Sequence, residues 1–254
     1  MTGPSHSVPA ADELIVAPSL LAADFAVSAA RSVAELADWL HVDIMDGRFV
    51  PNRTIGLDHF AALRAATTIP LDTHLMITDP DVWAVRYAEA GSTYVTFHAE
   101  ACPDPAALAK DIRAAGARAG LAIDRDTPVE PYLELLPHID MLLIMTIKAG
   151  AGGQAFLPHL LDKVRTARAH RDADDLQVRI EVDGGIAEDT IGQAVAAGAD
   201  TFVAGTAVFH ASDPATAVRR LRELAVATRA RARAADAADA DAADAVPPGG
   251  EGER

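Results

Sequence analysis

The feature that most constrains this chain is a repeated pattern, in which eight short apolar runs alternate with alanine-rich segments of helical periodicity. Such runs are typical of strands that are buried on both faces of a parallel sheet. The eight runs occupy residues 14–18, 39–45, 70–76, 93–98, 118–123, 140–146, 177–183 and 200–205. Eight strand–helix units predict an α/β fold and usually close into a (β/α)8 TIM barrel, but the periodicity alone also fits a doubly wound open sheet.

The length of 254 residues agrees with the roughly 250 residues of a single barrel. We expect residues 1–13 to be a flexible leader and residues 14–229 to form the catalytic barrel. Residues 230–254 are dominated by Ala and Asp and have no large apolar anchor, so we expect a disordered or transiently helical tail.

The net charge of −15 disfavours nucleic acid and anionic membranes as partners. The N-terminus has no secretory signal pattern, and no apolar run reaches the roughly 18 residues of a membrane span. Cys102 is the single cysteine, so no internal disulfide can form. We therefore expect a cytoplasmic protein, for which a homo-oligomer is an open alternative to a monomer.

Two imidazoles and two carboxylates stand on the predicted strands near their carboxyl ends, at His41, Asp43, His74 and Asp183. In a barrel these ends form the face that carries active sites. A lone buried His or Asp is usually a core or capping residue, but the joint position of these four favours one divalent metal ion, with Zn, Fe, Mn and Co all compatible. Asp72 fits a helix cap or loop anchor and is expected to lie outside the ligand set.

Glycine-rich segments follow the last three predicted strands, at 149–154, 183–185 and 204–207. Glycine lets backbone N–H groups approach a ligand, and the loops after strands 7 and 8 of barrels commonly bind phosphate. Met45, Met76 and Met145 lie at strand ends, and we expect them to line the site.

Seven stretches resemble the ribulose-phosphate 3-epimerase family. They are APSLLAADFA (17–26), HVDIMDGRFVPN (41–52), LDTHLMI (71–77), VTFHAEA (95–101), GGQAFLP (152–158), IEVDGGI (180–186) and GADTFVAGTAVF (198–209). The resemblance spans nearly the whole predicted domain and implies the barrel, which decides between the two folds that periodicity leaves open.

The resemblance also implies roles for individual residues. His41, Asp43, His74 and Asp183 match the family's metal ligands, and Asp43 and Asp183 match its acid/base pair. The residues expected to bind substrate are Ser19, His74, Gly152, Gly153, Gly184, Gly185, Gly205 and Thr206. The implied reaction interconverts D-ribulose 5-phosphate and D-xylulose 5-phosphate. A proton is removed and another returned, through an enediolate that a divalent metal stabilises.

The loop after the sixth predicted strand departs from the family. Its members usually have an acidic residue or Asn before Pro-Gly-Phe-Gly-Gly-Gln, whereas this chain has KAGAGGQ at 148–154, and Arg48 replaces a usual His. The altered loop keeps open a hexulose 6-phosphate 3-epimerase, such as one acting on allulose 6-phosphate. Lys148 keeps open, less favourably, a Schiff-base aldolase. A non-catalytic binding protein is disfavoured, because the metal and acid/base residues are all present.

Overall fold

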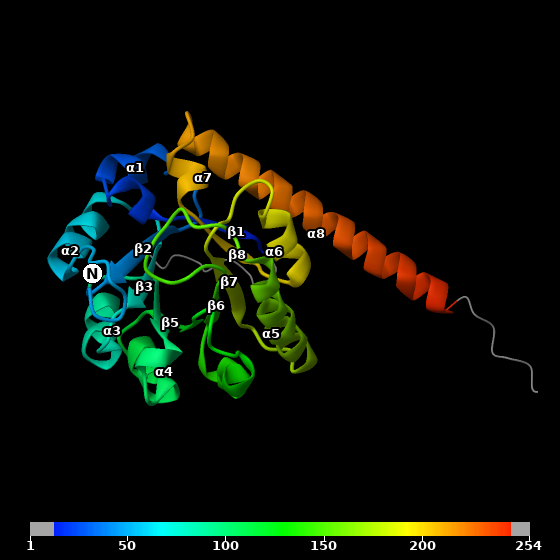
Figure 1. The fold of residues 1–254 in the computed structure, drawn as a ribbon, viewed down its shortest axis with the longest axis horizontal. Helices are drawn as coiled ribbons and strands as arrows, with labels where there is room; N and C mark the ends of the chain where they lie inside the picture. The colour runs from blue at the N-terminus through cyan, green and yellow to red at the C-terminus, as the bar shows by residue number, and fades with distance from the viewer. Residues whose placement is uncertain (1–12, 245–254) are drawn as a thin grey trace, which may run out of the picture.

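The computed structural model of the protein describes residues 13–244, with side chains through Ala235. Within this range eight strands form one parallel sheet in the order β1-β8-β7-β6-β5-β4-β3-β2 (Figure 1). A parallel bridge between Ser19 and His41 links the first strand to the second and closes the sheet into a barrel. The predicted (β/α)8 barrel is confirmed, and the open doubly wound sheet is excluded.

Each predicted strand is present, with ends that differ by no more than two residues from the prediction. The strands are β1 (Ile15–Pro18), β2 (Leu40–Met45), β3 (Leu71–Met76), β4 (Tyr94–His98), β5 (Arg118–Ile123), β6 (Met141–Met145), β7 (Arg179–Asp183) and β8 (Thr201–Ala204).

The helices between the strands cover the outside of the barrel (Figure 1). The α-helices are α1 (Val27–Ser32), α2 (Leu57–Ala66), α3 (Pro80–Glu89), α4 (Pro105–Ala114), α5 (Leu161–Ala173), α6 (Ile191–Ala197), α7 (Thr206–Phe209) and α8 (Pro214–Asp244). The 3₁₀ turns are η1 (Leu20–Ala23), η2 (Ala99–Ala101), η3 (Glu130–His138) and η4 (Pro158–Leu160). The connection after β5 is the 3₁₀ segment η3 and not an α-helix. Pro137 lies within it and has no N–H to donate to an α-helical ladder.

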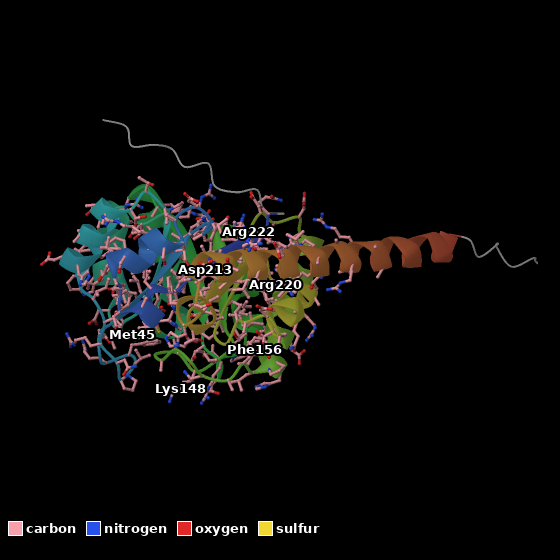
Figure 2. All side chains as sticks on the ribbon, turned by 90° about the horizontal axis from the view of Figure 1, so that it is seen from above. Met45, Lys148, Phe156, Asp213, Arg220 and Arg222 are labelled. Carbon is pink, nitrogen blue, oxygen red and sulfur yellow. The ribbon has the colours of Figure 1, made fainter. Side chains whose placement is uncertain are left out.

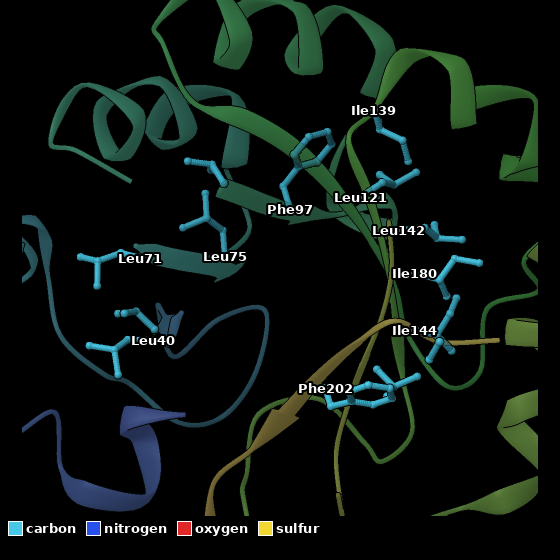
Figure 3. Packing of buried hydrophobic residues seen from close by; sticks show 14 of the residues in the cluster. Leu40, Leu71, Leu75, Phe97, Leu121, Ile139, Leu142, Ile144, Ile180 and Phe202 are labelled. Atoms are coloured by element: carbon cyan, nitrogen blue, oxygen red, sulfur yellow. The ribbon is translucent and has the colours of Figure 1, made fainter. Parts of the chain in front are cut away.

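Two apolar layers and one polar layer follow from the alternation of side chains along each strand. Leu40, Val42 and Ile44 of β2 face outward and join the large core between strands and helices (Figure 3). The intervening residues of β2 face into the barrel. At the amino ends of the strands the barrel interior is closed by Ile15, Ala17, Trp39, Tyr94 and Met141. Above this plug the inward positions of several strands are polar, and there the candidate site is built.

The last helix is longer than the sequence predicts. Val218, Leu221 and Ala225 of α8 are buried against the barrel, and the helix then continues away from it to Asp244 (Figure 1). Of the two states expected for residues 230–254, the structure describes the helical one for residues 230–244. The tail has no large apolar side chains that could form a core, but it is rich in alanine, which has the highest helix propensity. The predicted leader, apart from Glu13, and residues 245–254 lie outside the described residues.

None of the helices between residues 13 and 244 combines the length and apolar character that a bilayer crossing requires.

We expect a chain ending at Ala230 to keep its thermal midpoint of unfolding and its activity. The apolar side chains that anchor α8 all precede this point, and residues 230–235 are exposed. Differential scanning calorimetry of the shortened chain measures this. Leu221→Ala, within the buried part of the helix, is the contrasting variant and should lower the free energy of unfolding by about 2–5 kcal/mol. A shortened chain as destabilised as Leu221→Ala would contradict the prediction.

Candidate active site and metal centre

The four predicted ligands meet inside the barrel on three strands, β2, β3 and β7. His41 and Asp43 lie two residues apart on β2, and the parallel register places His74 of β3 beside Asp43. Asp183 is the last residue of β7. One ligand atom from each of the four lies within 4.8 Å of the others, and the three residues on β2 and β3 are buried.

The spacing of these atoms suits a metal ion. Asp43 Oδ1 lies 3.4 Å from both His41 Nε2 and His74 Nδ1. Asp183 Oδ2 lies 3.9 Å and 3.7 Å from the same two nitrogens. Both nitrogens are buried and have no hydrogen-bond partner in the described part of the chain. Tetrahedral sites with bonds of about 2.1 Å place ligand atoms roughly 3.4 Å apart, so the residues present fit a divalent cation.

The two carboxylates of the site have pKa values that are pushed apart. Burial raises the pKa of Asp43, but the positive charge of His41 and the two imidazole rings that face this carboxylate outweigh it and hold the pKa well below its usual range. Burial and the negative charge of Asp43 raise the pKa of Asp183 to about 7. One carboxylate is therefore ionised while the other gains and loses its proton near neutral pH.

The two imidazoles also differ in charge. Burial lowers the pKa of His41, but the neighbouring Asp43 and Asp72 raise it well above the usual value. Burial lowers the pKa of His74 to about 4, so this ring is neutral. Without a metal ion, the proton on His41 supplies the positive charge that the buried carboxylates require.

Asp72 is fully buried on β3, and its Oδ2 lies 2.6 Å from Nδ1 of His41. The interpretation of Asp72 as a helix cap or loop anchor is wrong, because it lies within the strand and its side chain faces the barrel interior. Its exclusion from the ligand set stays a prediction, because Asp72 also forms a second group of ligand-type side chains with His41 and Glu181. A carboxylate behind a ligating His fixes the orientation of the ring, and here it turns Nε2 towards the site.

Ser19 follows β1 and connects the first strand to the candidate site. Its hydroxyl donates to Asp43 Oδ2 over 2.7 Å and accepts from the N–H of Leu21 at the start of η1. The hydroxyl thus holds the carboxylate oxygen of Asp43 that does not face the two imidazoles.

A cavity of about 410 Å³ opens above the cluster. Its lining includes the predicted residues Ser19, Asp43, Met45, Met76, Met145, Gly152, Gly153, Asp183, Gly184, Gly185, Gly205 and Thr206. His41 and His74 are fully buried and are not among the lining residues. The cavity therefore brings together the two carboxylates of the cluster, the methionines and all three glycine loops. A substrate contact by His74 stays a prediction.

The loop after β7 requires glycine. Gly184 and Gly185 have φ angles of +120° and +68°, which side chains rarely adopt. A Cβ on Gly184 would lie 2.3 Å from the Ile147 side chain, and one on Gly185 would lie 2.8 Å from the backbone of Phe156. The glycines thus allow the chain to turn tightly beside the cavity.

The altered segment 148–154 borders the cavity, but Lys148 itself is exposed. Figure 2 shows Lys148 at the outer edge of the molecule, on the side where Met45 lies. The segment is held by Gln154, which donates to the carbonyls of Lys148 and Ala151, and by Asn52, which donates to the carbonyl of Gly150. Arg48, the other departure from the family pattern, pairs with Asp79 over 3.0 Å on the surface.

Sequence reasoning assigned no role to His98, Glu100 or Glu181. His98 Nε2 lies 2.9 Å from His74 Nε2, and His98 Nδ1 lies 3.0 Å from Glu100 Oε2. Glu181 is fully buried, with one oxygen 4.0 Å from His41 Nδ1. The signal was present in the polar letters of VTFHAEA and RIEVD, but only the closed barrel shows which residues these side chains meet.

Two carboxylates that differ in protonation, beside a set of metal-type donors, are suited to moving a proton on and off a carbon next to a carbonyl group. The fold and the site together define a (β/α)8-barrel enzyme of the isomerase class.

The family model of the ribulose-phosphate 3 epimerase family matches residues 15–209. Ribulose-phosphate 3-epimerases of Mycobacterium tuberculosis and Mycobacterium leprae are 57% identical over 212 residues. These cover 83% of this chain and 93% and 95% of the relatives. The cytoplasmic isoform of ribulose-phosphate 3-epimerase from Oryza sativa is 43% identical, over 82% of this chain and 92% of its own. The chain belongs to the ribulose-phosphate 3-epimerase family.

Solved structures support the fold at greater distance. KGPDC from Streptococcus mutans aligns with a TM-score of 0.65 at 19% identity, covering 85% of this chain and 99% of its own. A 3-hexulose-6-phosphate synthase aligns with a TM-score of 0.62 at 24% identity, covering 84% and 99%. At these identities the likeness shows the shared barrel.

We expect the affinity for Zn²⁺ to rise as the pH is raised from about 6 to 8, because ligand atoms must lose their protons to bind a metal. The raised pKa values of His41 and Asp183 mean that protons compete with the metal below neutrality. Competition with a chromophoric chelator at several pH values measures this. Affinity that does not change over this range would contradict the protonated states assigned to the two residues.

Proposed function

We propose that this chain interconverts D-ribulose 5-phosphate and D-xylulose 5-phosphate by inverting the carbon next to the ketone. The observation that carries the proposal is the pair Asp43 and Asp183, whose pKa values differ in direction and whose side chains share one cavity. The relatives named ribulose-phosphate 3-epimerase at 57% identity support the choice of substrate.

In this mechanism the carboxylate that is ionised removes the proton from the substrate carbon, and the carboxylic acid returns a proton to it. Asp43 is the base and Asp183 the acid in one direction, and the roles exchange in the other. Ser19 holds the second oxygen of Asp43, so that the base keeps its orientation during transfer. Met45, Met76 and Met145 line the cavity and exclude water from the reacting carbon.

His41, Asp43, His74 and Asp183 would hold one divalent ion, with Zn, Fe, Mn and Co as candidates for this donor set. When bound, the ion supplies a positive charge that stabilises the negative oxygen of the enediolate.

The phosphate group is proposed to bind at the glycine loops formed by Gly152 and Gly153, Gly184 and Gly185, and Gly205 with Thr206. These residues lie around the cavity, and backbone N–H groups can bind an anion where the overall charge of −15 would repel it. A cytoplasmic location agrees with the Oryza sativa relative that is named as a cytoplasmic isoform.

The structure favours neither alternative reaction. A Schiff-base lysine needs a desolvated environment, whereas Lys148 is exposed. A hexulose 6-phosphate substrate would need support from similar relatives of that name, and the mycobacterial and plant relatives described above are all named ribulose-phosphate 3-epimerase.

Asp43→Asn and Asp183→Asn are each expected to lower kcat by roughly 10²–10⁴-fold, because an amide cannot accept the proton. The assay follows D-ribulose 5-phosphate to D-xylulose 5-phosphate and the incorporation of solvent deuterium at the inverted carbon. Metal content is measured on the same samples, so that loss of the metal is not mistaken for loss of the base.

Asp58→Asn, an exposed charge change on α2, is the matched control and should leave kcat unchanged. Near wild-type turnover in either site variant would refute the two-base assignment. Faster turnover of allulose 6-phosphate than of ribulose 5-phosphate by the wild-type protein would refute the proposed substrate.

Lys148→Ala is expected to raise KM with a smaller effect on kcat, because an exposed cation beside the cavity favours an anionic substrate without joining the chemistry. Steady-state kinetics at low and high ionic strength measures this, and the effect should shrink in salt. Unchanged KM would show that Lys148 only faces water. Complete loss of turnover, with borohydride trapping of substrate on the wild-type protein, would favour the Schiff-base reaction.

A further inference from the structure

A row of hydrogen-bonded side chains leads from the candidate metal centre through His74 and His98 to the carboxylate of Glu100. Nε2 of His74 lies 2.9 Å from Nε2 of His98, and Nδ1 of His98 lies 3.0 Å from Oε2 of Glu100. His98 is the last residue of β4 and is fully buried, and the ring of Phe49 packs on it with centroids 4.8 Å apart. Neither His98 nor Glu100 lines the cavity, so neither is placed to touch a substrate.

Glu100 is the last side chain of this row, and both of its carboxylate oxygens accept hydrogen bonds. Oε1 accepts the backbone N–H of Asp124 over 2.8 Å, while Oε2 faces His98. Burial raises the pKa of Glu100, but hydrogen bonds from His98, Thr127 and Asp124 outweigh it and lower the pKa to about 2. The carboxylate is therefore ionised and has no proton to give.

If both imidazole rings are neutral, each ring carries one proton, and the hydrogen bonds allow only one position for each of these two protons. Glu100 can only accept, so Nδ1 of His98 carries the proton and Nε2 of His98 has the lone pair. The lone pair accepts from His74, so Nε2 of His74 carries the proton and Nδ1 of His74 has the lone pair. This nitrogen lies 3.4 Å from Asp43 Oδ1 and has no hydrogen-bond partner among the described residues.

We propose that His98 and Glu100 are positioning residues that hold His74 in the tautomer whose Nδ1 is free to bind the metal. The inference rests on the metal site of the proposed function. Asp72 fixes the orientation of the His41 ring by direct contact, and Glu100 fixes that of the His74 ring through the ring of His98. The same carboxylate also ties the end of β4 to the residue after β5, so the pair is fixed by two strands.

Glu100→Gln is the sharpest test, because it changes the proton pattern while keeping the shape. The N–H of Asp124 requires an oxygen, so the glutamine NH₂ must turn towards His98 Nδ1. His98 then has to protonate Nε2 and donate to His74, which moves the proton of His74 onto Nδ1, the atom that faces the metal. Glu100→Ala leaves room for water, which can donate or accept, and therefore does not force this reversal.

We expect Glu100→Gln to weaken Zn²⁺ binding by about 10–100-fold, as outer partners of metal ligands commonly do, and Glu100→Ala to weaken it less. Chelator competition measures the affinities, and calorimetry checks that each variant is folded. Glu134→Gln removes an exposed charge from η3 and should bind Zn²⁺ like the wild-type protein. Equal affinity of Glu100→Gln and wild type, or weaker binding by Glu100→Ala than by Glu100→Gln, would overturn the proposal.

Nitrogen NMR of the metal-free full-length protein, labelled in its histidine rings, reads the tautomers directly. We expect a protonated Nε2 in His74 of the wild-type protein and a protonated Nδ1 in Glu100→Gln, with His74→Asn assigning the resonance. A protonated Nδ1 in the wild-type protein overturns the inference even if a variant fails to fold. Absence of Zn²⁺ binding by the wild-type protein would instead refute the metal site of the proposed function, and the tautomer measurement would still stand.

Discussion

The charges buried inside the barrel place the strongest demand on the rest of the structure. His41, Asp43 and His74 are almost fully removed from water, and Asp183 is the one carboxylate of the cluster with partial exposure. A buried carboxylate is costly unless a positive charge or hydrogen bonds compensate it. The cluster meets this demand with two inward-facing nitrogens that no other group in the described part of the chain uses. A divalent ion between them would satisfy all four residues at once.

Polar side chains around the cluster also compensate its buried charges, by binding the atoms of the cluster that face away from its centre. Asp72 and Ser19 bind the atoms of His41 and Asp43 that do not face the centre. On the other side, His98 and Glu100 do the same for His74. Each group fixes a ring or a carboxylate that would otherwise be free to rotate, so the donor atoms are held in place before any ligand binds. The apolar plug around Trp39 and Tyr94 closes the barrel below, and the cavity therefore opens in one direction.

The pKa values of Asp43 and Asp183 differ because the two carboxylates have different neighbours in the barrel. Asp43 sits between two imidazoles, whereas Asp183 lies at the end of β7 next to the negative charge of Asp43. Two side chains of the same type thus acquire different protonation states. The difference arises from which charged side chains the neighbouring strands place beside each carboxylate.

The sequence by itself determined the strands, the barrel and the four candidate ligands. Strand burial leaves a local pattern of apolar letters, and residues such as His41 and Asp43 are conspicuous within it. For the tail the sequence left a disordered and a transiently helical state open, because composition does not separate a solvated helix from a solvated coil, and the structure describes helix up to Asp244. Only the tertiary structure decided that Asp72 supports His41 and that Glu100 reaches His74 through His98. His41, His74 and His98 lie on three different strands, and contacts between strands depend on sheet register and barrel closure, which leave no local pattern in the chain.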